Sequence, residues 1–490
     1  MAEGARTQGP GSLRVLSLLL VLLALLPPAV SLATKRQLFT LGGLTDNWIY
    51  LGANLRVSGV LGEERLPMVL RAPGYPLFVA GVFGVALEKP PRVTDAYMLR
   101  GAMAVYAPQA ILLALSGLLL FLWLSDLVTR ATAFAAGLVL ATGPYAVVLV
   151  GLVHYSVLHL FLLVAGGLAL HRLLSAATPS RGAVLATGLL WGCTTLVRST
   201  TLILPVFVLA LFWLRSRDLR QSLGRAALFT AGMGLVIAPA TIRNYRVADR
   251  FVAVNLQAGA AVWGSTVKPL PADPDSYRWY EISDEFMRIY SRVTGRQEYD
   301  YALFAPYHVQ MEDAMRREAL ANLRRDPRPY LTNGLRTLRT LYLDTSSILI
   351  RVFQFSQPPR PWVDQFWFRG DGPRDALPAV PARGYVRLGS VLTALAGIGL
   401  VLAIWRRDVL ALAPAVLFSC LVAAHVLTYM DVLYQYVRLP FVTFLAFYGV
   451  EALGRLAPEA ARPAATLAAR AAVLLLSAAS LVLTAQLLST

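Results

Sequence analysis

The sequence is poor in charge, in lysine and in cysteine. Only 15% of its 490 residues are charged while 57% are hydrophobic, whereas soluble domains carry about 25% charged residues. These values exclude a soluble globular protein and indicate a polytopic membrane protein. Lysine occurs only at positions 35, 89 and 268, so the net charge of +17 comes almost entirely from arginine.

Further absences narrow the class of function. Cys193 and Cys420 lie in apolar runs, so we expect packing residues and neither a disulfide framework nor a metal site. The sequence has no glycine-rich phosphate loop, nucleotide-binding signature or Ser/His/Asp order, which disfavours a cytoplasmic nucleotide-sugar enzyme. Much of the arginine lies in short loops between apolar runs, where charge sets topology and meets anionic lipid. We therefore expect no nucleic-acid partner.

Long apolar runs fill most of the remaining sequence. A membrane-spanning helix needs about 20 largely apolar residues. We predict eleven spans, at residues 13–33, 102–125, 132–150, 154–171, 183–197, 201–214, 226–242, 384–405, 409–428, 439–455 and 471–488.

The first apolar run has two interpretations. Arg6 and Arg14 precede it, and Ser31-Leu32-Ala33 has the small-x-small pattern of a signal-peptide cleavage site. We expect it to be retained as a first transmembrane helix. Under either interpretation, Asp46 lies outside the cytoplasm.

Arginine also predicts the topology. Four arginines in the loop 215–225 place that loop in the cytoplasm by the positive-inside rule. If the first span exits outward, residues 72–88 cannot cross the membrane once. With Pro73, Gly74 and Pro76, this segment is expected to form a shallow juxtamembrane or re-entrant helix.

Counting alternating spans from the cytoplasmic loop 215–225 divides the chain into three predicted regions. Residues 1–242 form a transmembrane module with a catalytic first outer loop at 34–101, residues 243–383 an extracytoplasmic domain, and residues 384–490 the last transmembrane helices.

Local patterns predict the content of the extracytoplasmic domain. We expect a strand-like run at 251–255 and helices at 277–293, 302–325 and 329–352. In the middle helix, Met311, Met315 and Leu320 follow a period near 3.6 with Glu and Arg on the other face.

This topology gathers ionisable residues at the outer ends of the spans, where we place Asp46, Arg71, Arg198, Arg243 and Arg438. Few ionisable residues fall near the bilayer midplane, which disfavours a proton-coupled transporter. Several arginines around one site suit a phosphate or pyrophosphate. Asp46 beside them is a candidate general base for an acceptor hydroxyl.

Structural alternatives accompany each of these roles. Asp46-Asn47-Trp48 opens an amphipathic run, so Asp46 also suits the N-cap of the following helix. An arginine at a helix end is often a snorkelling anchor.

Further polar residues lie at the outer ends of later spans. His154, Tyr155 and His159 lack the i, i+4 spacing of a metal pair, and a polar cavity wall or plain packing suits them better than metal binding. His425, Asp431, Tyr434 and Arg438 form a second polar group around an outer loop.

Several short stretches together resemble one family, the polytopic lipid-linked glycosyltransferases of the GT-C class. The resemblance is to the bacterial branch related to protein O-mannosyltransferases and lipid A aminoarabinose transferases. It rests on motifs spread over nearly the whole chain: Asp46 with Tyr50, Arg71 to Pro76, Leu196 to Ser199, Arg243-Asn244-Tyr245, Asp326-Pro327, and Arg438-Leu439-Pro440.

The resemblance implies a GT-C-like, all-α bundle of about eleven to thirteen transmembrane helices with juxtamembrane helices and a small, mainly helical extracytoplasmic domain. It also implies a polyprenyl-phosphate sugar donor, transfer on the extracytoplasmic face and Asp46 as catalytic base, with Arg243 and Arg438 holding donor phosphate. Related enzymes often carry a second acid where this chain has Gly151 to Ser156; no Asp or Glu occurs there.

We therefore expect an integral protein of the bacterial cytoplasmic membrane that transfers a sugar to a glycan, lipid or protein acceptor among membrane lipids, without cofactor or metal. A non-enzymatic lipid-linked-glycan transporter or assembly scaffold is the alternative. The candidate substrate-binding residues are Tyr50, Arg71, Tyr75, His154, Arg198, Arg243, Asn244, Tyr434 and Arg438.

Overall fold

The computed structural model describes residues 10–34, 48–63, 65–151, 153–267, 284–297, 301–342, 379–428 and 436–489. Within these ranges the chain is almost entirely helical. The strands there are a two-residue antiparallel pair, β1 (Gly62–Glu63) and β2 (Leu66–Pro67). The expected all-α class is confirmed.

Nine candidate spans among the described residues are long and apolar enough to cross a membrane. They are formed by α1 (Pro10–Thr34), α4 (Asp95–Leu124), α7 (Ser156–Ser175), η2 (Ser199–Ile203) with α9 (Leu204–Ser216), α10 (Leu219–Ala248), α17 (Ala379–Trp405), α18 (Val409–Val426), α19 (Leu439–Gly454), and η5 (Glu459–Ala461) with α20 (Arg462–Ser489). Three shorter apolar helices accompany them: α3 (Gly74–Ala86), α5 (Arg130–Thr142) and α8 (Arg181–Val197). Each predicted span lies on one or more of these helices, and α3 covers most of the segment expected not to cross.

The prediction of one uninterrupted span at 132–150 is wrong. Helix α5 ends at Thr142, and a separate helix, α6 (Pro144–Val150), begins after Gly143. Pro144 has no backbone N–H, and Gly143 is extended at φ −60° and ψ 144°. The Thr484 hydroxyl of α20 donates to the Thr142 carbonyl over 2.5 Å. A side chain from another helix thus satisfies a backbone group that the break releases.

Small residues let the first helices pack closely. A Cβ added to Gly117 of α4 would lie 2.6 Å from the Gly137 carbonyl oxygen of α5. Leu20 of α1 is fully buried in the same core. Such close contact between small residues is typical of helix association in membranes.

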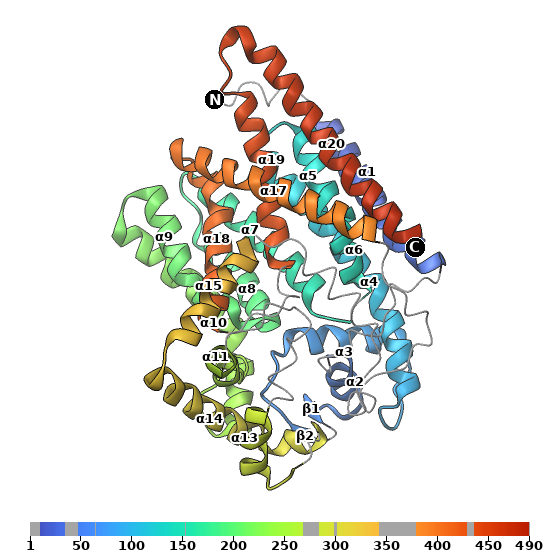
Figure 1. Cartoon of the computed structure of the whole chain (residues 1–490), viewed down its shortest axis with the longest axis vertical. Coiled ribbons are helices and arrows are strands. Elements are labelled where there is room, and N and C mark those ends of the chain that lie inside the picture. The colour runs from blue at the N-terminus through green and yellow to red at the C-terminus, as the bar shows by residue number, and fades with distance from the viewer. Residues whose placement is uncertain are drawn as a thin grey trace.

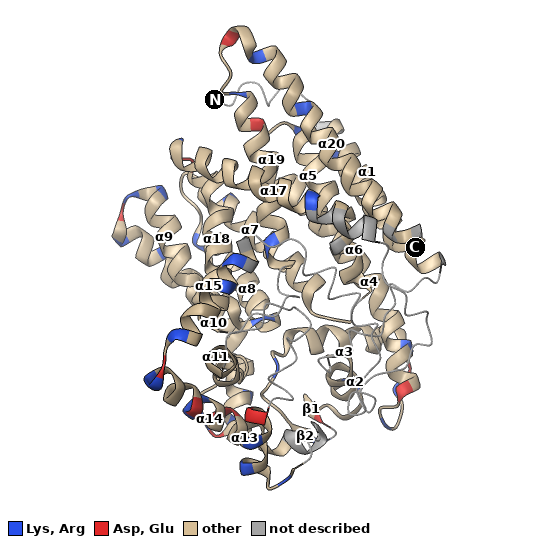
Figure 2. Cartoon of the chain, viewed as in Figure 1, with Lys and Arg blue, Asp and Glu red and all other residues tan. Residues whose placement is uncertain are grey.

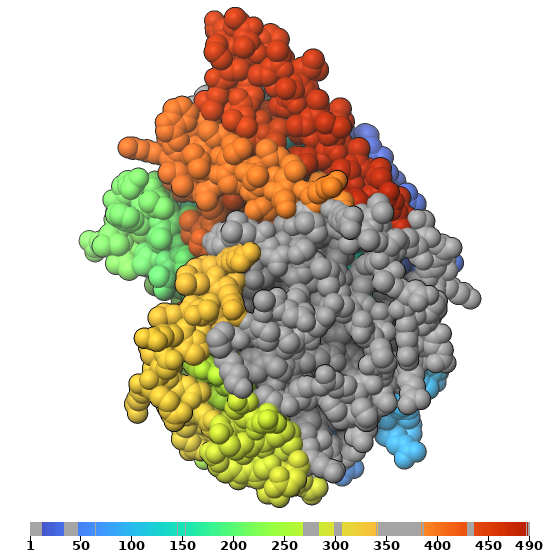
Figure 3. All heavy atoms as spheres, viewed as in Figure 1, coloured from blue at the N-terminus to red at the C-terminus, as the bar shows by residue number. Residues whose placement is uncertain are grey.

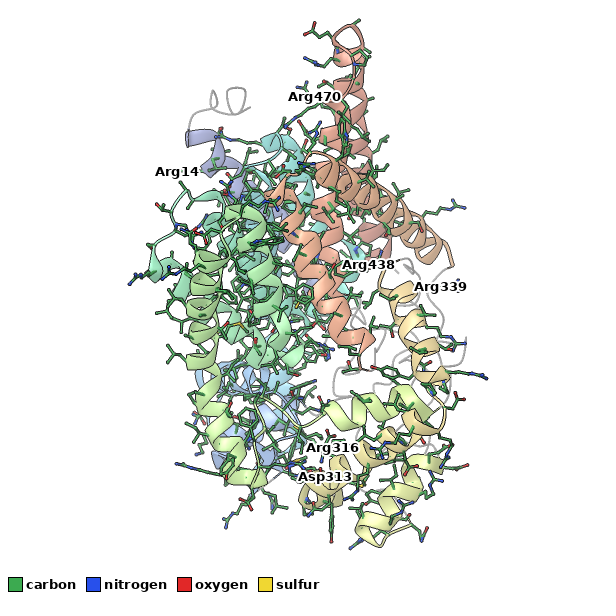
Figure 4. The ribbon with its side chains drawn as sticks, turned by 90° about the vertical axis from the view of Figure 1, so that its left-hand side faces the viewer. Arg14, Asp313, Arg316, Arg339, Arg438 and Arg470 are labelled. Atoms are coloured by element: carbon green, nitrogen blue, oxygen red, sulfur yellow. The ribbon has the colours of Figure 1, made fainter. Side chains whose placement is uncertain are left out.

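The molecule has two distinguishable ends along its long axis. Arg14 and Arg470 lie toward one end, Asp313 and Arg316 lie near the other, and Arg438 lies between them (Figure 4). Charged residues are concentrated toward these ends, and the middle of the bundle has few (Figure 2). We call the end that carries Asp313 the outer end, after the topology predicted from the positive-inside rule.

A small helical domain occupies the outer end. It contains α11 (Ala258–Val267), α13 (Asp284–Thr294), α14 (Tyr301–Arg325) and α15 (Arg328–Tyr342), and lies below the transmembrane helices (Figure 1). Its separate apolar core includes Trp263, Phe286, Tyr290, Met311 and Met315. The expected helices 302–325 and 329–352 correspond to α14 and to α15, and residues 343–352 lie outside the described residues.

Three details of that domain correct the sequence expectations. Leu320 is not on the buried face, since it is 50% exposed and Ala319 is buried instead. Glu312 lies inside, at 3% exposure, because its carboxylate accepts from the Gly259 and Ala260 N–H groups at the start of α11. The run 251–255 is not a strand.

Candidate functional site

Two of the predicted site residues, Asp46 and Tyr434, lie outside the described residues. The chain enters the described region at Trp48, two residues after Asp46, where α2 (Trp48–Ser58) begins. Tyr50 is the third residue of α2 and is half-buried. The roles proposed for Asp46 and Tyr434 stay predictions.

Trp48 is the centre of an aromatic contact network. It is 3% exposed and meets the Tyr75 ring of α3 edge-on, with ring centroids 6.0 Å apart. It meets the Tyr155 ring in the same way at 5.1 Å. The Arg71 guanidinium carbon lies 5.4 Å from the Trp48 ring centroid, within cation–π range. The start of α2 is therefore packed between α3 and the start of α7.

Arg198 joins the same network at the end of α8. It donates one hydrogen bond to the Tyr155 hydroxyl and a second, of 3.0 Å, to His425 Nε2. The His425 Nδ1 lies 2.6 Å from the Leu421 carbonyl oxygen, which can only accept. His425 therefore carries its proton on Nδ1 and is the neutral acceptor for Arg198.

A third element closes the network from the C-terminal helices. The Tyr436 ring lies edge-on to Tyr155 with centroids 6.3 Å apart, and its hydroxyl is 2.6 Å from His159 Nδ1. His154 packs on the Tyr155 ring at 3.9 Å and hydrogen-bonds to the Ser156 hydroxyl. Both histidines are buried.

The position of α3 is fixed by a buried polar chain and a close backbone contact. The Tyr75 hydroxyl donates to Gln109 Oε1 over 2.9 Å, and Gln109 Nε2 donates to the Val150 carbonyl over 2.9 Å. A Cβ on Gly74 would lie 2.7 Å from backbone atoms of residues 196 and 197. The start of α3 thus lies directly against the backbone that leads into Arg198.

Together these side chains form one unit, which we call the arginine–aromatic cluster. Its members come from α2, the loop before α3, α3, the start of α7, the end of α8, α18 and the start of α19: Trp48, Arg71, Tyr75, His154, Tyr155, His159, Arg198, His425 and Tyr436. A pocket beside it is lined by Leu51, Leu61, Met68, Leu70 and Arg71.

Arg243 and Asn244 have other contacts. Arg243 donates to the Leu61 carbonyl over 2.6 Å and to the Asn244 side chain over 3.0 Å. The Asn244 amide donates to the Val252 and Val254 carbonyls over 3.3 and 2.8 Å. These bonds brace α10 against the loop after α2 and hold the segment that had been expected to form a strand.

Arg438 lies two residues after Tyr436 at the start of α19. It is 5% exposed, and its Nη2 donates to the Thr393 hydroxyl of α17 over 2.5 Å. The described contacts therefore place Arg71 and Arg198 in the cluster and Arg438 beside it.

Several residues of this site are absent from the candidates named from the sequence, Gln109, Trp48 and Tyr436 among them. Gln109 is the one amide side chain in the apolar run 102–125, and a buried amide needs partners, so its isolation was a usable signal. Trp48 follows Asp46 closely, but no local pattern indicates that its partners are Tyr75 and Tyr155.

Among the described residues, no group of three or more His, Cys, Asp or Glu is arranged to hold a metal ion. Since Asp46 is outside that set, the expectation of a metal-free site stays a prediction.

Neither a family model nor a curated protein matches the chain. Among solved structures, the oligosaccharyltransferase AglB from Archaeoglobus fulgidus, in complex with an inhibitory peptide and a dolichol-phosphate, is similar over 96% of this chain and 55% of that chain. The TM-score is 0.51 and the sequence identity 14%. The same enzyme tethered with an acceptor peptide gives a TM-score of 0.50 at 13% identity, over 95% of this chain and 55% of that chain.

ArnT from Cupriavidus metallidurans bound to undecaprenyl phosphate aligns over 91% of this chain and 79% of that chain at 14% identity. Its TM-score of 0.36 is too low to add to the fold assignment. The chain spans about half the length of the AglB structures. The likeness to AglB confirms the GT-C-like fold expected from the sequence.

Proposed function

We propose that the protein is an integral-membrane glycosyltransferase that moves a sugar from a polyprenyl-phosphate donor to an extracytoplasmic hydroxyl-bearing or phosphate-bearing acceptor. The acceptor is a lipid, a protein or a polysaccharide. Asp46 acts as general base. The fold supports this proposal, since the AglB structure that shares it contains a dolichol-phosphate and a peptide.

One observation carries the proposal: the arginine–aromatic cluster brings the chain just after Asp46 into contact with two arginines distant in sequence. Trp48 packs against Tyr155 and under Arg71, and Tyr155 binds Arg198. A carboxylate and arginines at one site match the needs of sugar transfer from a lipid phosphate.

For a hydroxyl acceptor, the reaction is a single displacement. Asp46 takes the proton of the hydroxyl as its oxygen forms a bond to the sugar C1. The bond between C1 and the phosphate oxygen breaks, its electron pair leaves with the polyprenyl phosphate, and the configuration at C1 inverts. Arg71, Arg198 and Arg438 stabilise the charge that develops on the leaving phosphate, a large contribution in such sites. The lipid phosphate carries the activation, so no nucleotide is needed.

Transfer of radiolabelled sugar from polyprenyl-phosphate donors, measured in membranes that carry the wild-type protein or Asp46→Asn, tests the proposal. We expect a loss of about 10²- to 10⁴-fold in transfer with Asp46→Asn, while the detergent-extracted protein stays monodisperse. Asp218→Asn, which changes an acid that caps α10, is the matched control. Undiminished transfer by Asp46→Asn would remove Asp46 from the mechanism.

The alternative function, a lipid-linked-glycan transporter or assembly scaffold, predicts a different result. Wild-type membranes would then transfer no sugar from any donor, yet a labelled lipid-linked glycan would bind or cross. A one-sided cavity with Asp46 at its floor favours the enzyme, and a continuous polar path across the bundle favours the transporter.

A further inference from the structure

Helix α15 of the outer domain has one exposed stripe that its own packing does not explain. Leu331 and Leu335 are 60% and 67% exposed, although neither belongs to a candidate membrane span. Arg328 and Arg339 are also exposed. With 3.6 residues per turn, all four side chains fall on one face of the helix.

The opposite face of α15 is buried against the rest of the protein. Asn333 is buried and donates to the Ser265 carbonyl of α11 over 2.8 Å. Thr337 and Leu341 are buried on the same side. The exposed stripe therefore does not result from a loosely attached helix.

The helix lies at the level where a transmembrane helix ends. The Tyr330 hydroxyl donates to the carbonyl of Leu427, the residue directly after α18, over 3.1 Å. A Cβ on Gly334 would contact Val426 at 3.5 Å. In Figures 1 and 3, α15 lies at the edge of the molecule, between α18 and the rest of the outer domain, so its exposed stripe lies near the level where α18 ends.

The charge around the stripe is positive. Arginines 324 and 325 end α14 and arginines 328, 336 and 339 lie along α15, against one acid, Asp326, between the two helices. Arg336 Nη1 is shielded from solvent, so the exposed Arg328 and Arg339 are the arginines on α15 that can meet an anionic surface.

We propose that α15 is an interfacial helix that docks the outer domain onto the membrane, with Leu331 and Leu335 inserted beneath anionic phospholipid headgroups that Arg328 and Arg339 bind. Exposed leucines framed by arginines are the composition of helices that lie in the interface plane. Each arginine near an anionic surface shifts the equilibrium between docked and undocked helix by about fivefold. The inference does not depend on the proposed glycosyl transfer.

A nitroxide at Leu331→Cys or Leu335→Cys tests the proposal in the full-length protein. The protein is reconstituted in nanodiscs that contain either phosphatidylcholine alone or phosphatidylcholine with phosphatidylglycerol. Power saturation compares accessibility to oxygen, which partitions into the bilayer, with accessibility to a water-soluble nickel chelate. The control site is Arg296→Cys, an exposed residue just after α13, a helix that lies far from α18 in Figure 1. Both natural cysteines are replaced by alanine in all variants.

We expect the labels at 331 and 335 to be more accessible to oxygen than to the nickel chelate, and the difference to be larger with phosphatidylglycerol. The label at 296 should be more accessible to the chelate. Arg328→Glu with Arg339→Glu should reduce the phosphatidylglycerol effect at 331 by an order of magnitude or more, while leaving 296 unchanged. Chelate-accessible labels at 331 and 335 in both lipids would overturn the proposal. Shielding of these sites only after an acidic glycan or protein is added would also overturn it, because the stripe would then bind that partner.

Discussion

Arg198 binds Tyr155 in two ways at once, through a hydrogen bond to the hydroxyl and by placing its guanidinium carbon 5.1 Å from the ring centroid. The same ring packs edge-on against Trp48. One tyrosine therefore links the start of α2 to an arginine more than forty residues beyond that tyrosine in the chain. If Arg198 stabilises a leaving phosphate, Tyr155 decides where that charge lies.

The first prediction concerns this hydroxyl. Tyr155→Phe keeps the ring and removes one acceptor of Arg198, so we expect sugar transfer to fall about 10- to 150-fold, because a hydrogen bond to a charged group contributes about 1.5–3 kcal/mol. The matched control is Tyr448→Phe, whose hydroxyl donates to Asp408 at the start of α18. Equal activities of the two variants would show that the hydroxyl of Tyr155 does not orient Arg198 for catalysis.

A second prediction contrasts two glycines of the same helix. Gly74→Ala should destabilise the protein and reduce transfer, because its Cβ would lie 2.7 Å from backbone atoms of residues 196 and 197, next to Arg198. Gly81→Ala, with no atom within 4 Å of its Cβ, should be neutral or stabilising by up to about 1 kcal/mol. Melting temperatures in detergent and transfer rates check both, and equal melting temperatures would contradict the close contact.

A third prediction concerns the buried amide. Gln109→Leu leaves the Tyr75 hydroxyl and the Val150 carbonyl without their partner, at a cost of about 1–3 kcal/mol for each buried group. Tyr75→Phe leaves the bond from Gln109 to Val150 intact and should destabilise about half as much. Thermal unfolding of the purified variants measures the difference. A larger loss for Tyr75→Phe would contradict the polar chain.

A fourth prediction is a pH dependence of the outer domain. Burial raises the pKa of Glu312, although the N–H groups of Gly259 and Ala260 act in the opposite direction. A raised folded-state pKa means that the folded domain holds its proton more tightly than the unfolded chain does. The resulting stabilisation is complete below the ordinary pKa near 4.5 and is lost as the pH rises through the raised pKa.

Hydrogen exchange in α11 measures that effect. We expect protection of the α11 amides against exchange to decrease with rising pH in the wild type. The part of this pH dependence that comes from Glu312 should vanish in Glu312→Gln. Glu318 lies on α14 like Glu312, and its carboxylate pairs with Arg288 of α13. Glu318→Gln should keep the wild-type slope. An unchanged slope in Glu312→Gln would assign the pH dependence to another group.

Nine of the eleven spans predicted from the sequence fall on helices long and apolar enough to cross a membrane, because each is a long apolar run, whereas the spans at 132–150 and 183–197 fall on shorter apolar helices. The sequence also predicted that residues 72–88 stop short of a full span. It failed where a distant partner decides the local structure. Glu312 was assigned to the polar face by its spacing, yet the first N–H groups of α11 require an acceptor there. The run 251–255 has the composition of a strand, but the Asn244 amide donates hydrogen bonds to its Val252 and Val254 carbonyls.

The candidate site was only partly accessible from sequence for the same reason. The motifs selected Arg71, Tyr75, His154 and Arg198, which the structure brings to one cluster. They also selected Arg243, which instead binds the Leu61 carbonyl. Spacing along the chain predicts which end of the bundle a residue occupies, but the contact partners of Trp48 depend on how α2, α3 and α7 pack.

The break between α5 and α6 has a consequence for biosynthesis. The Thr142 carbonyl receives its hydrogen bond from Thr484, which is 342 residues further along the chain. At ordinary translation rates, roughly 20 to 70 seconds separate the synthesis of the two residues. During that interval the nascent chain holds an incomplete helix at the edge where α20 will pack. A chain truncated before α20 would lack this donor for the Thr142 carbonyl, so packing of α20 completes the hydrogen bonding at the break between α5 and α6.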